Sequence, residues 1–192
     1  MNGYINVGED YLWMDATVQN NRGSSYDLTQ FFGADWLADT KWVLRFSTNL
    51  HSSSAYSGGN CAVAYFVLSS LDSNDYWETQ DYIGVVAIPY QGQTGIKNVL
   101  TNDDGMGSWG DTAMADMSGK DYWEITRDGD NFVWRRYSDS AYEDLSNVRE
   151  MNKSGIENLR YLKTMNHFVA GSCSVQISID DLLFYDAVSA VP

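Results

Sequence analysis

Turn-forming residues recur about every ten positions along this chain and separate short runs rich in Val, Ile, Tyr, Phe and Trp. The 192 residues include 16 glycines but only 2 prolines, so glycine makes most of the breaks together with Asn, Asp and Ser. This rhythm is typical of an antiparallel sandwich or barrel. It continues without a linker or a change in composition, so we expect a single all-β domain over residues 1–192. The turn signals lie at 20–23, 57–60, 92–95, 103–105, 118–119, 128–130 and 170–172.

The alternation of apolar and polar residues predicts which side of a strand is buried. In the segment 42–50, Trp42, Leu44 and Phe46 fall on one face, and the segment 174–180 alternates in the same way. The segments 122–127 and 131–137 flank Asp128-Gly129-Asp130, which predicts a hairpin. The segments 61–70 and 81–88 are more continuously apolar, as expected for central strands that are covered on both faces.

Three segments carry a family resemblance. The first combines residues 26–28 with a strand at 39–46, and the second is the hairpin that continues to Tyr137-Ser138-Asp139. The third closes the chain with Ile179-Asp180-Asp181 and, four residues later, Tyr185. In this order and spacing they resemble concanavalin A-like (laminin-G-like) jelly-roll domains. The resemblance implies a jelly-roll β-sandwich with its core at 26–186, preceded by an N-terminal strand or extension at 1–25. It leaves lectins, adhesion modules, hydrolases and lyases open.

Catalytic motifs are missing from the sequence. Hydrolases of the resembled fold carry Glu-x-Asp-x-x-Glu on one strand, and this chain has no such pattern. Two acid pairs, Glu78 with Asp81 and Asp180 with Asp181, point to opposite faces if extended. A lyase would need a basic site beside a Tyr/His pair, and a lone histidine in a strand-like stretch, such as His167, is more often structural. We therefore expect no catalytic residues and no enzyme, with a hydrolase or lyase as the lesser alternative.

Loop aromatics beside Asn and Asp favour a sugar ligand instead. The chain has 7 Trp, 13 Tyr and 7 Phe. Sugar rings pack on aromatic faces while polar side chains bind the hydroxyls. Trp109 is the strongest candidate because glycines flank it closely, whereas Trp42 and Trp123 fit the core; local packing is the alternative for each loop ring. The candidate ligand-binding residues are Trp109, Tyr76, Trp77, Tyr90, Tyr56 and Tyr142.

Two loops offer oxygen ligands for Ca²⁺, which many domains of the resembled fold bind. The alternative is that Asp and Asn merely favour turns. No other cofactor is expected. The candidate metal ligands are Asp72, Asn74 and Asp75 in one loop and Asp103 and Asp104 in the other.

The formal charge of −14, from 12 Lys and Arg against 26 Asp and Glu, argues against nucleic acid and anionic membranes as partners. Residues 1–7 lack the features of a signal peptide, and no apolar run of about 18 residues occurs. Cys61 and Cys173 are compatible with one disulfide or two thiols.

We expect a non-catalytic carbohydrate-binding or adhesion module that binds cell-surface glycans outside the cell or on a virion. The alternative is a self-associating structural protein of a virion, fibre or cell surface, with a homo-oligomeric state.

Overall fold

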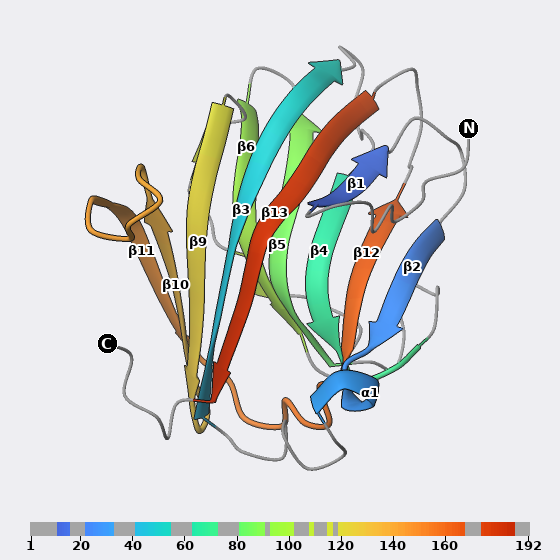
Figure 1. Ribbon diagram of the computed structural model, residues 1–192, viewed down its shortest axis with the longest axis vertical. Helices are drawn as coiled ribbons and strands as arrows, with labels where there is room; N and C mark the ends of the chain where they lie inside the picture. Colours follow the sequence, from blue (N-terminus) through green and yellow to red (C-terminus); the bar gives the residue numbers. More distant parts are fainter. Residues whose placement is uncertain are drawn as a thin grey trace.

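The computed structural model describes residues 11–15, 22–32, 41–54, 63–72, 81–90, 93–101, 108–109, 115–116, 119–167 and 174–186. They form two antiparallel sheets that face each other (Figure 1). A six-stranded sheet has the order β1-β13-β3-β9-β10-β11. A seven-stranded sheet has the order β2-β12-β4-β5-β6-β7, with β8 also paired to β6. This arrangement confirms the predicted all-β sandwich.

The six-stranded sheet is built from β1 (Tyr11–Asp15), β3 (Lys41–Ser54), β9 (Gly119–Asp128), β10 (Asn131–Tyr137), β11 (Leu145–Asn152) and β13 (Ser174–Asp186). The seven-stranded sheet is built from β2 (Arg22–Asp27), β4 (Val63–Ser69), β5 (Tyr82–Tyr90), β6 (Gln93–Thr101), β7 (Ser108–Trp109), β8 (Ala115–Asp116) and β12 (Tyr161–His167). A single-turn helix, α1 (Thr29–Phe32), follows β2. Within the described ranges, no helix has both the length and the apolar character needed to cross a membrane.

The core lies between the two sheets and is rich in aromatic rings. Trp42, Leu44 and Phe46 face inward from β3, as the alternation predicted, and Phe46 meets Phe66 of β4 with ring centroids 4.7 Å apart. Trp123 is fully buried, and its Nε1 donates a hydrogen bond of 2.9 Å to Thr48 Oγ1. Satisfying the indole N–H inside the core removes the cost of burying it.

Strands β4 and β5 are covered on both faces, which confirms the prediction of central strands. Their inward residues join the core, while Tyr65, Val67, Tyr82 and Val86 form a second buried cluster on the other side of the sheet. Burial raises the pKa of Tyr82 to about 12. The outward side of β4 and β5 is therefore largely apolar and buried.

The predicted hairpin is present as β9 and β10, with Asn131 paired to Asp128. Gly129 has φ = 62°, a left-handed conformation that glycine adopts without a side-chain penalty. Arg127 Nε donates 2.9 Å to the Gly129 carbonyl and supports the turn. This short connection sets the register of two strands that carry functional candidates.

Strand β13 contains a break in register that the alternation did not predict. Its pairing with β3 runs to Asp180 opposite Ser47 and resumes at Leu183 opposite Arg45. Two residues, Asp181 and Leu182, therefore oppose one residue of β3, which is a β-bulge. Asp181 has φ = 56°, so the chain turns sharply where two carboxylates are adjacent.

Candidate functional site

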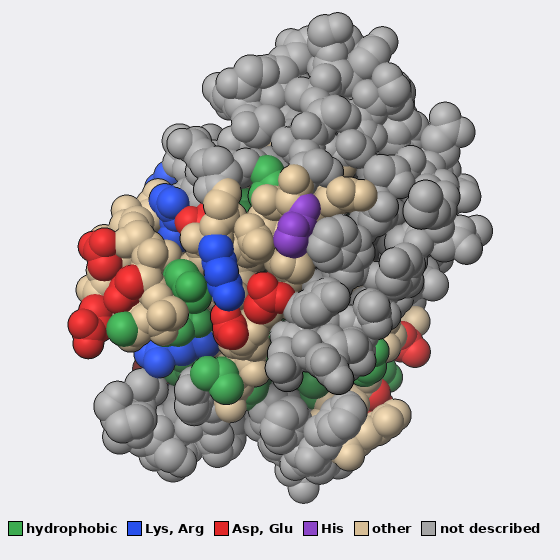
Figure 2. Space-filling model, turned by 45° about the horizontal axis from the view of Figure 1, so that its top comes forward, with side chains coloured by type: hydrophobic (Ala, Val, Ile, Leu, Met, Phe, Trp, Pro, Cys, Tyr) green, Lys and Arg blue, Asp and Glu red, His purple; other side chains and the backbone are tan. Residues whose placement is uncertain are grey.

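The outer face of the six-stranded sheet, on the side away from the core, carries charged and tyrosine side chains. Figure 2 shows basic, acidic and apolar side chains close together on one face of the molecule, with a histidine nearby. Strand register brings together residues from the central strands β13, β3, β9 and β10. The outer-face residues used below are Arg45, Ser47, Asn49, His51, Lys120, Tyr122, Glu124, Arg135, Tyr142, Ser178, Asp180 and Asp181.

Glu124 forms the centre of one ion-pair network on this face. Arg45 donates to its Oε2 from Nε at 2.8 Å and from Nη2 at 2.7 Å. Arg135 donates to its Oε1 at 3.0 Å. Glu124 is only 7% exposed, and the two guanidinium groups offset the cost of burying its carboxylate.

Tyr142 packs on top of this network. The loop between β10 and β11 returns over the sheet because Asp139 Oδ1 accepts hydrogen bonds from the backbone N–H groups of Glu143 and Asp144. Tyr142 has φ = 60°, and the Arg45 guanidinium lies 4.5 Å from its ring centroid. Its ring also meets those of Tyr137 at 5.3 Å and Tyr122 at 6.0 Å.

A second cluster surrounds Lys120. Its Nζ lies 2.9 Å from Asp181 Oδ2 and 3.8 Å from Asp180 Oδ2. Ser47 Oγ also donates to Asp181 Oδ2, at 2.8 Å. The expectation that Asp180 and Asp181 point to opposite faces is therefore wrong, because the bulge turns both carboxylates toward the same ammonium group.

The two carboxyl groups differ in acidity. Burial raises the pKa of Asp180, with the charge of Lys120 acting in the opposite direction. Hydrogen bonds from Lys120 and Ser47 lower the pKa of Asp181, and the bond to Asp181 raises the pKa of Lys120. Adjacent acids with opposite shifts are a feature of sites that perform acid–base chemistry.

A serine and a histidine lie next to this cluster. His51 Nε2 is 3.0 Å from Ser178 Oγ, and Ser178 also bonds to the Asp180 side chain. Sequence motifs missed this group because its members come from β3 and β13, which pair across more than a hundred residues. Ser178 is 4% exposed, so it is a supporting hydroxyl rather than an accessible nucleophile.

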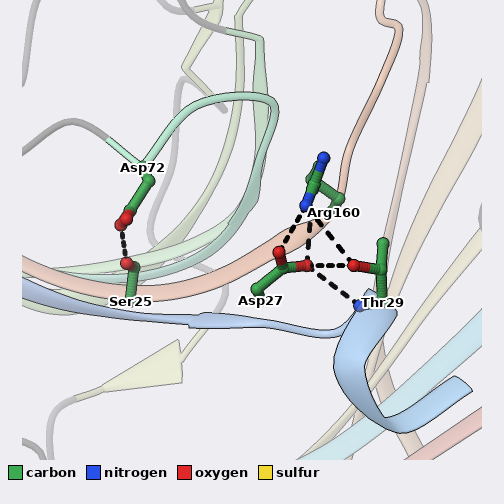
Figure 3. Close-up of polar contacts among 5 residues, drawn as sticks. All are labelled: Ser25, Asp27, Thr29, Asp72 and Arg160. Atoms are coloured by element: carbon green, nitrogen blue, oxygen red, sulfur yellow. Dashed lines mark hydrogen bonds and ion pairs between the residues drawn. The ribbon is translucent and has the colours of Figure 1, made fainter. Parts of the chain in front are cut away.

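Of the candidate metal ligands, only Asp72 is described. Its Oδ1 accepts a hydrogen bond from Ser25 Oγ (Figure 3). Within the described ranges, no three His, Cys, Asp or Glu side chains are grouped to hold a metal ion. Calcium stays a prediction, since Asn74, Asp75, Asp103 and Asp104 lie outside the described residues.

Among the candidate aromatics, only the Tyr142 side chain is described, and it is packed by neighbours as well as partly exposed. Trp109, expected in a loop, lies in β7 opposite Val99, and Tyr90 ends β5. Nothing is described of their side chains. Tyr56, Tyr76 and Trp77 lie outside the described residues, as do Cys61 and Cys173.

Comparisons with known proteins agree on the architecture. No family model matches the chain, and no curated protein matches it. Among solved structures, a family 7 alginate lyase in complex with product has 14% identity and a TM-score of 0.54, covering 95% of this chain and 82% of its own. A legume lectin-like domain from Entamoeba histolytica has 14% identity and a TM-score of 0.52, covering 96% and 87%. A β-glucanase from Bacillus licheniformis has 8% identity and a TM-score of 0.53, covering 96% and 89%.

This chain has the concanavalin A-like jelly-roll fold. At these identities the likeness shows the fold alone. The fold neighbours also overturn the expectation that the chain is not an enzyme, which rested on the missing hydrolase motif and the missing lyase-type basic site. The concanavalin A-like matches include lyases and a glucanase, so the absence of Glu-x-Asp-x-x-Glu does not exclude catalysis.

Proposed function

We propose that this protein acts outside the cell and binds carbohydrate on the outer face of its six-stranded sheet. The observation that carries the proposal is the Tyr122 ring beside ion-paired polar groups on this side of the sheet. Lys120 Nζ lies 5.4 Å from the Tyr122 ring centroid, and Tyr142 meets the ring in an edge-to-face contact with centroids 6.0 Å apart. Rings next to fixed donors and acceptors are what sugar ligands require. Fold neighbours that include a legume lectin-like domain and an alginate lyase in complex with its product support this choice.

Replacing Tyr122 with alanine tests the proposal. We expect Tyr122→Ala to weaken binding to immobilised polysaccharide at least tenfold, because the ring supplies the apolar contact area. Tyr161→Ala is the matched control, since Tyr161 is also half-buried beneath a cation, with Arg160 4.9 Å from its centroid, but lies in the other sheet. Equal losses in both variants, or a wild-type protein that binds no polysaccharide and only forms a large oligomer by light scattering, would contradict the proposal.

Cleavage of glycosidic bonds is a second candidate function, favoured by the opposite pKa shifts of Asp180 and Asp181. In this reaction Asp180, protonated, gives its proton to the glycosidic oxygen as the bond from that oxygen to the anomeric carbon breaks. Water attacks the anomeric carbon and loses a proton to the ionised Asp181 carboxylate. Glycosidases divide the work between two carboxyl groups in this way.

Release of new reducing ends from polysaccharide measures this second function. Activity is expected only between the two pKa values. It falls as the pH rises through the raised pKa of Asp180, and it falls as the pH drops through the lowered pKa of Asp181. Asp180→Asn is expected to abolish release at every pH, whereas Asp128→Asn, in the exposed Lys41–Asp128 pair of the same sheet, keeps it. Release by Asp180→Asn at the wild-type rate would exclude Asp180 as the acid.

A further inference from the structure

Two rows of residues cross the outer face at the site. Tyr122 of β9, Ser47 of β3 and Asp180 of β13 are aligned in register. Lys120, Asn49 and Ser178 form the next row. In the first row the short Ser47 side chain of β3 lies between the longer side chains of Tyr122 and Asp180.

The Lys120 side chain extends from β9 across β3 toward β13. Since strands lie about 4.8 Å apart, β9 and β13 are separated by about 10 Å, and the ammonium group spans that width to reach Asp181. The bridge covers Ser47, which explains how a serine on the outward side of β3 is fully buried. Lys120, Ser47 and Asp181 thus form a polar platform of fixed geometry, with the Tyr122 ring at its edge.

The platform still has hydrogen-bonding capacity. Lys120 and Ser47 both bind Oδ2 of Asp181, and among the described residues Oδ1 has no partner. The Asp181 side chain is 55% exposed, so this oxygen is accessible to a ligand. A carboxylate oxygen accepts hydrogen bonds and therefore selects hydroxyl donors.

The cations of the outer face are already paired. Arg45 and Arg135 both bind Glu124, and Lys120 binds Asp181. In the described part of this face these three cations are matched by three carboxylates, those of Glu124, Asp181 and Asp180, so no excess positive charge is present for the carboxylate of a uronate, and the chain as a whole carries −14. A uronic acid would be repelled here, whereas neutral hydroxyls would be bound.

We propose that Tyr122, Lys120, Asp180 and Asp181 form a subsite for a neutral sugar residue, which the Lys120–Asp181 bridge selects over uronic acids. This inference rests on the proposed carbohydrate binding and adds the class of ligand. Tyr122 supplies the stacking face, the Asp oxygens accept sugar hydroxyls, and Lys120 donates. The fold neighbours named alginate lyases would thus differ from this chain in ligand class.

Affinity electrophoresis of the full chain tests the subsite, with β-glucan, mannan and xylan as neutral probes and alginate and polygalacturonate as acidic ones. We expect retardation by at least one neutral probe, unchanged between 50 and 500 mM salt (about 14 to 4 Å of screening length). Asp181→Asn and Lys120→Met are expected to reduce that affinity at least tenfold. Asp128→Asn and Lys41→Met, in an exposed pair of the same sheet, are expected to leave it within about twofold.

The outcomes separate the two proposals. If no probe retards the wild-type protein, carbohydrate binding itself fails, and the subsite fails with it. Stronger, salt-sensitive retardation by the acidic probes overturns the neutral subsite while leaving carbohydrate binding in place. Neutral binding that the Lys120 and Asp181 variants retain, with thermal unfolding that shows them folded, places the ligand elsewhere and overturns the subsite as well.

Discussion

Asp27 is the described residue whose acidity is most clearly tied to one contact. Its carboxylate pairs with Arg160 and accepts hydrogen bonds from Thr29 N at 3.0 Å and Thr29 Oγ1 at 2.6 Å (Figure 3). These bonds lower its pKa from 3.8 to about 2, with the Arg160 bond as the largest cause. A single side chain therefore joins the end of β2, the start of α1 and the segment that leads into β12.

The lowered pKa of Asp27 makes stability depend on pH. The ionised form is favoured in the folded state, so its contribution is fully present above the unfolded pKa near 3.8 and is lost as the pH falls toward 2. We expect Asp27→Asn to lower the urea midpoint at pH 7 and to match the wild-type protein near pH 2. Urea titrations at both pH values measure this difference. A gap of equal size at pH 2 would show that the charge of Asp27 is not its cause.

At the scale of elements, the β9–β10 hairpin depends on one glycine. Gly129 has φ = 62°, and a Cβ atom added there would meet nothing within 4 Å, so backbone conformation alone decides the effect of a substitution. We expect Gly129→Ala to lower the free energy of unfolding by about 1 kcal/mol. Gly129→Asn is the control, because Asn tolerates this region and should lose less than half as much. Equal losses for Ala and Asn in urea unfolding would refute a conformational origin.

The elements were largely predictable from sequence, and the candidate site was not. Alternation identified the inward face of β3, and Asp-Gly identified the hairpin, because both signals are local. The site depends on the bulge at Asp181, where one extra residue of β13 interrupts its pairing with β3. Strict alternation assigns Asp180 and Asp181 to opposite faces, so no local pattern brings both to Lys120, which lies about sixty residues earlier in the chain.

At the scale of the whole molecule, the acidic excess is accompanied by extensive pairing of the cations. In the described structure Lys41, Arg45, Lys120, Arg135, Arg136 and Arg160 each lie within 4.0 Å of a carboxylate. The remaining field around the molecule is negative, which opposes polyanionic partners at a distance and acts before any contact forms. Surface charge and the proposed subsite would therefore select against the same class of ligand.

The position of β13 has a consequence for how the chain assembles. This strand is the last described in sequence, yet it lies between β1 and β3, and it pairs with both. While the chain is being synthesised, β1 and β3 are made long before β13. Until β13 follows, the backbone edge of each strand that pairs with β13 has no partner. The sheet that carries Asp180 and Asp181 is thus completed late, by long-range pairing that is intrinsically slow. The two carboxylates and Lys120 come together only when that final insertion takes place.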